Sequence, residues 1–126
     1  MAKATPDAVL DLILTGIALS DEMFICSAEP ANYAGIAAVQ LATVALTPGD
    51  GNGDFVIANH TSGRKLTVGA QSAIDIVTSG TATHVVLAVG GATDVIKQIT
   101  TCTSQALVDT GTVSTPAYII SVSDPT

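Results

Sequence analysis

The side chains best suited to chemistry in this chain lie in one glycine-rich loop. Asp50, Asn52 and Asp54 alternate with two glycines, which places oxygen ligands at every second position, as in the first half of a calcium-binding loop. A helix-loop-helix calcium site also needs Gly at its sixth position and Glu at its twelfth. This sequence has Phe55 and Thr61 there. The pattern therefore favours an open loop between two strands, with these three residues as weak metal candidates whose shell another loop would have to complete.

The two histidines are not spaced for catalysis or zinc binding. Neither His60 nor His84 has a Cys, His or carboxylate at the short separations of a zinc site. His60 falls in a predicted turn, and His84 shares a strand face with Ala82, Val86 and Ala88, which indicates a hydrogen-bonded or interface histidine. Nucleophile elbows, phosphate loops and dinucleotide motifs do not occur in the sequence. We therefore predict no catalytic residue, no cofactor and no enzymatic activity.

Composition excludes several classes of partner. Eleven acidic residues against four basic ones give a net charge of −7, which disfavours binding to nucleic acid and to anionic membranes. The apolar segment 9–19 is interrupted by Asp11 and preceded only by Lys3, so it predicts neither a signal peptide nor a membrane span. A soluble protein made in the cytoplasm is expected. Cys26 and Cys102 are then expected to be free, buried thiols, although a disulfide between them stays open.

Short alternating runs indicate the fold class. Leu66 and Val68 fall on one face of a strand, and Lys65 and Thr67 fall on the other. Strands with turn residues between them are predicted at 23–27, 39–47, 55–59, 65–70, 72–77, 83–89, 95–100 and 118–123, with a less distinct one at 105–108. We predict a mainly β protein, an antiparallel β-sandwich or small barrel of about eight short strands.

Three local features complete the prediction. The glycines after 83–89 predict a hairpin with 95–100, and residues 29–33 have no period and predict an irregular crossing. A single short helix is expected at about 6–19, with Thr5 as its cap and Pro6 in its first turn. The apolar stripe of this helix consists of Leu10, Ile13, Leu14 and Ile17. Either the protein's own sheet or a neighbouring subunit must cover it. Residues 1–126 are expected to form one domain, with the β part at about 22–124.

Five segments carry a resemblance to a protein family. They are DGNGDF at 50–55, TSGRKLTV at 61–68, SGTATHVVL at 79–87, TCTSQAL at 101–107 and SDP at 123–125. Together they cover somewhat over a quarter of the chain, which resembles small virion proteins of tailed bacteriophages, of the capsid decoration or cement type. These segments are structural, so the resemblance carries over no catalytic residue.

The resemblance implies a non-enzymatic protein on the exterior of the capsid. Its partner would be the shell of the major capsid protein, and it would self-associate, for instance as a trimer at a local symmetry axis. A tail, neck or fibre component of the same particle is the alternative. A calcium- or carbohydrate-binding β-sandwich is a third possibility, supported only by the loop at 50–54 and opposed by the scarcity of aromatic side chains, which make up 3% of the residues.

Overall fold

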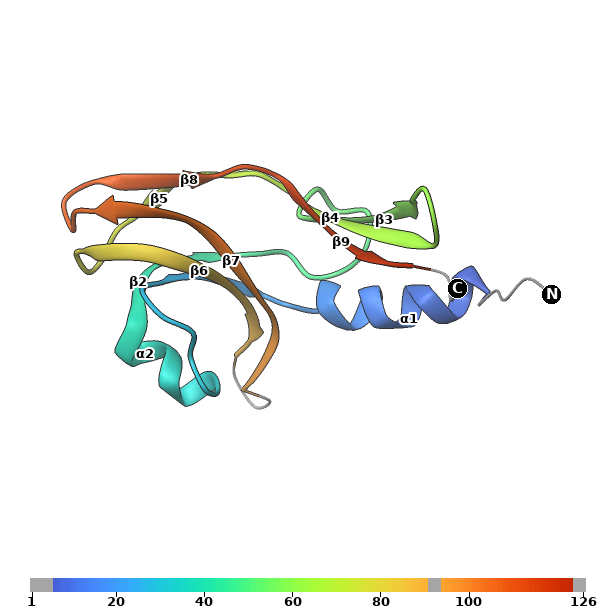
Figure 1. The fold of residues 1–126 in the computed structure, drawn as a ribbon, viewed down its shortest axis with the longest axis horizontal. Helices are drawn as coiled ribbons and strands as arrows, with labels where there is room; N and C mark the ends of the chain where they lie inside the picture. Colours follow the sequence, from blue (N-terminus) through green and yellow to red (C-terminus); the bar gives the residue numbers. More distant parts are fainter. Residues whose placement is uncertain (1–5, 91–93, 124–126) are drawn as a thin grey trace. The chain divides into compact units, whose positions relative to one another are not determined.

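The computed structural model describes residues 6–90 and 94–123. It has nine antiparallel strands in three sheets, an N-terminal helix and a short second helix (Figure 1). The predicted mainly β class is confirmed, and the described strands form no closed barrel. The chain divides into two compact units, each made of segments that are distant in sequence. The assignment of residues 1–126 to a single domain stays a prediction.

The first unit, here called the helix–sheet unit, comprises Met1–Leu19, Thr47–Ala70 and Pro116–Thr126. Its three-stranded antiparallel sheet has the order β3-β4-β9. The strands are β3 (Phe55–Asn59), β4 (Arg64–Val68) and β9 (Tyr118–Val122), and the helix is α1 (Asp7–Ala18). Helix α1 contacts all three strands. The buried side chains of this unit are Leu10, Leu14, Ala18, Phe55, Leu66 and Val68.

The predicted stripe of α1 is correct for three of its four residues. Leu10 and Leu14 are buried and Ile17 is half-buried, but Ile13 is 55% exposed. A residue in an α-helix advances about 100° around the axis, so Leu10, Leu14 and Ala18 at four-residue spacing form a narrow stripe and Ile13 falls beside it. The helix begins at Asp7 with Pro6 as its N-cap residue, and Thr5 lies outside the described residues.

The second unit, here called the two-sheet unit, comprises Ser20–Leu46 and Gln71–Thr115. Its larger sheet has the order β2-β1-β6-β7. These strands are β1 (Glu22–Cys26), β2 (Gln40–Ala45), β6 (Gly80–Val89) and β7 (Val95–Leu107). The predicted hairpin is confirmed, because β6 and β7 pair antiparallel. The residues between them at 91–93 lie outside the described part of the chain.

Both faces of this larger sheet are covered. On one face, Ile25, Leu41 and Ala82 pack with Ile74 and Ile76, which come from the second sheet and its edge. That sheet pairs β5 (Gln71–Asp75) with β8 (Thr112–Thr115).

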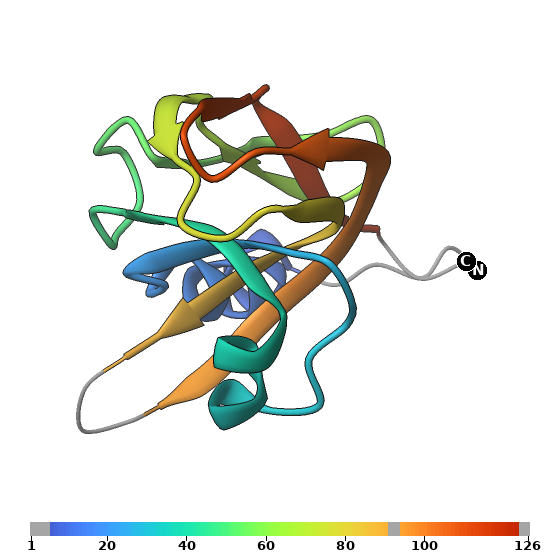
Figure 2. The same ribbon diagram turned by 90° about the vertical axis from the view of Figure 1, so that its left-hand side faces the viewer.

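On the other face, Phe24, Cys26, Val86 and Ala88 pack with Ile36. Ile36 begins α2 (Ile36–Val39), which follows the 3-10 turn η1 (Tyr33–Gly35). Figure 2 shows this unit with α2 toward the viewer. The unit is therefore layered as helix, sheet and sheet.

Three elements differ from the sequence-based expectation. The strands predicted at 95–100 and 105–108 are one 13-residue strand, β7. β8 lies at Thr112–Thr115, outside the strands predicted from the sequence, and residues 33–39 form η1 and α2 where no helix was predicted. The side chain of Asn32 starts that segment by accepting a hydrogen bond from the Gly35 N–H at 2.9 Å. Such short polar caps are frequent enough in loops that they predict a helix only in context.

Candidate functional site

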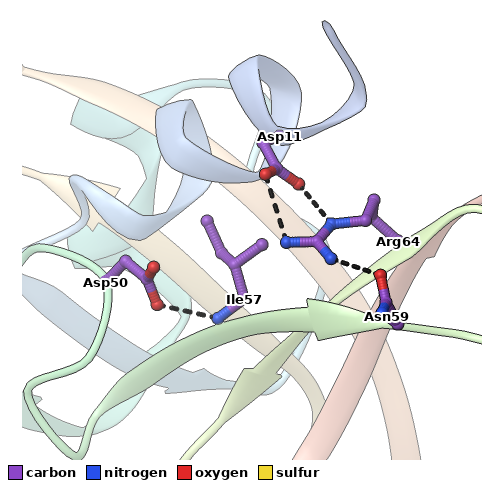
Figure 3. Close-up of polar contacts among 5 residues, drawn as sticks. All are labelled: Asp11, Asp50, Ile57, Asn59 and Arg64. Carbon is purple, nitrogen blue, oxygen red and sulfur yellow. Dashed lines mark hydrogen bonds and ion pairs between the residues drawn. The ribbon is translucent and has the colours of Figure 1, made fainter. Parts of the chain in front are cut away.

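The loop at 47–54 uses its polar side chains to hold itself together. The Asp50 carboxylate accepts a hydrogen bond from the Ile57 N–H at 2.8 Å (Figure 3). The Asp54 carboxylate accepts one from the Thr47 N–H at 2.7 Å. Asn52 donates from Nδ2 to the Pro48 carbonyl at 2.6 Å. Each of the three weak metal candidates thus makes a hydrogen bond to the backbone of this loop or of β3.

The glycines of this loop explain the alternation that resembles a calcium loop. Gly51 has φ 86° and Gly53 has φ 94°, a region that residues with a Cβ rarely adopt. The alternating pattern thus follows from backbone geometry in a tight connection to β3. Among residues 6–90 and 94–123, no group of three or more His, Cys, Asp or Glu side chains is close enough to share a metal ion.

One ion pair fixes α1 on its sheet. Arg64 of β4 donates to Asp11 of α1 through two nitrogens, from Nε at 2.7 Å and from Nη2 at 3.2 Å (Figure 3). Its third nitrogen, Nη1, donates to Asn59 at 2.5 Å. The hydrogen bond to Asp11 raises the pKa of Arg64. This two-point arrangement orients the helix more strictly than a single contact would. It also pairs the charge of Asp11 with that of Arg64.

Helix α1 also has an exposed apolar face. Leu12 is 70% exposed, and Val9, Ile13 and Leu19 are each about half exposed. We call these four residues the outer helix face. Gly16 lies among them in sequence, and a side chain placed there would meet no atom within 4 Å. The helix therefore has one apolar face against its sheet and a second one open to contact.

The histidines and cysteines are placed as single groups. His84 Nδ1 lies 2.8 Å from Thr83 Oγ1, so His84 is hydrogen-bonded as predicted. The expectation that Ala82 shares a strand face with Val86 and Ala88 is wrong. The β6–β7 register shifts between Ala82 and His84. Ala82 therefore packs with Ile74 and Ile76, whereas Val86 and Ala88 pack with Ile36. Both cysteines are free thiols. Cys26 is buried as expected, whereas Cys102 is exposed, contrary to the expectation.

The two-sheet unit contains a pocket on the α2 side of its larger sheet. The pocket has a volume of about 720 Å³. We call it the Tyr33 pocket, and its lining includes Glu22, Phe24, Asn32, Tyr33, Gln40 and Asp94. The rings of Phe24 and Tyr33 meet edge to face, with centroids 6.2 Å apart and an interplanar angle of 83°. The Tyr33 hydroxyl donates to Glu22 Oε1 at 3.0 Å.

Acidic side chains surround the Tyr33 hydroxyl. Burial is the first cause that raises the pKa of Tyr33, followed by the hydrogen bond and charge of Glu22. Asp94 and Asp21 raise this pKa further through their charges. Asp21 also accepts a hydrogen bond from the Gly90 N–H at 3.1 Å, which ties the end of β6 to the start of β1.

Sequence reasoning missed this pocket entirely. Its residues come from β1, η1, α2, β2 and the position just before β7, so no short motif contains them. One signal was available, because Tyr33 is one of only two tyrosines and lies in a segment without period. A scarce aromatic residue in an irregular segment is a candidate for a binding surface.

Two further findings bear on function. Helix α1 has 12 residues, and no helix in the described chain has the length and apolar content to cross a membrane. Comparison with protein families, with curated proteins and with solved structures found no match for this chain.

Proposed function

We propose that this chain is a non-enzymatic structural protein of a bacteriophage particle, which binds the assembled shell of the major capsid protein and stabilises it from the outside. The outer helix face supports this proposal. A helix that is apolar around most of its circumference is typical of one covered on more than one side. The β3-β4-β9 sheet covers one side of α1, and the shell would cover Val9, Leu12, Ile13 and Leu19.

A second exposed apolar pair in the same unit favours an extended contact surface. Val56 of β3 and Ile119 of β9 are 43% and 49% exposed. Both are register partners of Thr67 on β4, so they lie on the same face of the sheet. Leu66, the neighbour of Thr67, is buried, so this face is the one turned away from α1. The helix–sheet unit thus has apolar groups available on two sides.

The physics of shell binding suits such a surface. A decoration protein gains affinity from several modest contacts that act together, and its geometry is repeated at every site of the shell. Self-association, for instance as a trimer, would multiply the contacts further. The net charge of −7 keeps the chain soluble before assembly, while the uncharged outer helix face supplies the contact.

The test uses the full chain and particles from the phage that encodes it. The variant Leu12→Gln/Ile13→Gln changes two exposed side chains, so we expect unchanged folding by circular dichroism and a loss of binding to heads stripped of the protein, measured by co-sedimentation. The matched control is Val77→Gln/Val108→Gln, which changes two side chains that are 58% and 60% exposed in the two-sheet unit. The control should bind as the parent does.

A second readout is the stability of the particle. Heads without the protein should release their DNA at a lower temperature than complete heads, and added protein should restore them, because a ligand that binds only the assembled state stabilises it by mass action. Absence of the protein from purified particles would overturn the proposal. Its presence in tails, with equal DNA release from both kinds of head, would move it to the tail, neck or fibre.

A further inference from the structure

The Tyr33 pocket has acidic groups in its wall and no basic group among its described lining residues. Glu22 and Asp94 supply two carboxylates. Among the described residues, the ion pair that is found joins Asp11 and Arg64 in the other unit, so no described cationic side chain neutralises either pocket carboxylate. Glu22 has a neutral donor, the Tyr33 hydroxyl, at one of its oxygens. The pocket therefore has an uncompensated negative charge.

The aromatic pair adds a second kind of attraction for a cation. Phe24 is buried and Tyr33 is half-buried, and both rings line the pocket. A cation within about 6 Å of an aromatic ring centroid is attracted by the ring quadrupole, more strongly when it is partly removed from water. A pocket formed by two rings and two carboxylates thus offers apolar contact for the methylene groups of a long basic side chain and charge for its end.

We propose that the Tyr33 pocket binds a cationic side chain, lysine or arginine, presented by a partner protein. Charge complementarity identifies the occupant, because the wall is acidic and the chain as a whole carries a net charge of −7. The pocket is partly open, and its volume of about 720 Å³ leaves room for a long side chain. A side chain that arrives on a polypeptide also brings backbone amides, which the side-chain amides of Asn32 and Gln40 can bind.

The backbone at Gly90 lies against the Tyr33–Glu22 pair. A Cβ at this position would lie 2.7 Å from the Tyr33 hydroxyl oxygen and would also collide with Glu22 Oε1. The hydrogen-bonded pair therefore lies directly over the chain at Gly90. Because Tyr33 and Glu22 hold each other, the carboxylate is oriented before a ligand arrives, which lowers the entropic cost of binding.

The test is a titration of the full chain with three tripeptides, in which binding is measured from amide chemical shifts in NMR spectra. The probes are acetyl-Gly-Arg-Gly-amide, acetyl-Gly-Lys-Gly-amide and the citrulline analogue of the first, which has nearly the shape of arginine without its charge. We expect saturable shifts at Glu22, Tyr33 and Gln40 with the arginine or the lysine peptide. The citrulline peptide should produce no saturable shift.

The matched variants separate local from global charge. Glu22→Gln/Asp94→Asn removes two negative charges from the pocket and leaves an acceptor for the Tyr33 hydroxyl. Asp75→Asn/Asp109→Asn removes two from exposed positions outside the pocket lining. We expect the first variant to bind the cationic peptides about fivefold more weakly, the upper end for a partly exposed charge pair, and the second to bind as the parent does.

Three results would overturn the proposal. They are the absence of saturable shifts at the pocket with both cationic peptides, equal binding of the citrulline peptide, and equal weakening in the two charge variants. A melting temperature of Glu22→Gln/Asp94→Asn equal to that of the parent excludes loss of folding as the cause. The proposal is independent of the outer helix face. The variant Leu12→Gln/Ile13→Gln should therefore bind the peptides as the parent does.

Discussion

The central strands of the two units are buried in different ways. In the helix–sheet unit, β4 has Leu66 and Val68 buried and its other three residues half-buried, because α1 covers only one face of the sheet. In the two-sheet unit, Met23–Cys26 of β1 are all buried, because β5 and β8 cover one face of the sheet and α2 covers the other. The same length of strand thus contributes to one core in the first unit and to two in the second.

Substitutions should therefore have different effects in the two units. Met23–Cys26 of β1 are buried on both faces of the sheet, so truncation of any of these side chains leaves a cavity. In the helix–sheet unit, a residue one position away from a buried one is open to contact. That unit is better suited to docking, and the two-sheet unit is better suited to holding a shaped pocket.

The largest effect is expected at β1. Replacing Phe24 by Ala removes a ring that is 5% exposed and packs with Tyr33, so the free energy of unfolding should fall by about 3–5 kcal/mol. Urea unfolding followed by circular dichroism measures it. The control is Ile119→Ala on the open face of the helix–sheet unit, for which we expect less than about 1 kcal/mol. Equal losses would contradict the contrast between the units.

The two faces of α1 should also differ. Leu14 is fully buried and Ile13 is 55% exposed, so Leu14→Ala should lower the free energy of unfolding by about 2–4 kcal/mol. Ile13→Ala should lower it by about 0.5 kcal/mol or less. The same urea experiment decides this, and a loss at Ile13 as large as that at Leu14 would restore the stripe predicted from the sequence.

The free energy of unfolding should depend on pH through Cys26, a buried side chain of β1. Burial raises the pKa of Cys26 from 9.0 to about 11, so between these values the unfolded chain loses the proton and the folded chain keeps it. The free energy of unfolding should therefore have its full value below pH 9 and should fall as the pH rises toward 11. The Cys26 thiol should account for roughly 2–3 kcal/mol of this fall.

The comparison with Cys26→Ala isolates this contribution, because tyrosines titrate in an overlapping range. Urea midpoints of parent and variant between pH 8 and 11 should converge as the pH rises. Cys102→Ala, which changes the exposed thiol, should keep a steeper slope than Cys26→Ala does. Parallel slopes in the parent and in Cys26→Ala would show that the thiol is accessible to water in the folded state.

The smallest effect, with the opposite sign, is expected at Tyr118 in the helix–sheet unit. Its hydroxyl is buried and has no hydrogen-bond partner among the described residues, and burial raises the pKa of Tyr118 to about 12. Tyr118→Phe removes an unpaired polar group and should raise the free energy of unfolding by about 1 kcal/mol. A loss of stability in thermal unfolding would indicate that the hydroxyl has a partner after all.

Local sequence patterns were sufficient to predict most strands and α1. Period-two alternation predicted β3 at 55–59 with the bounds that the structure has, and the hairpin of β6 and β7 followed from its glycines. These features depend on neighbours in the chain, because alternation records which face is buried and glycine records where the backbone turns.

Long-range packing accounts for the rest. Ile13 and Leu14 are equally apolar, and only the three-dimensional arrangement shows that Leu14 is buried while Ile13 is 55% exposed. The Tyr33 pocket needs Glu22, Tyr33 and Asp94 to approach one another from three separate segments, and no local pattern encodes that approach. The sequence sets the strands through short-range sterics and burial, whereas the contact surfaces arise from the long-range packing of those strands.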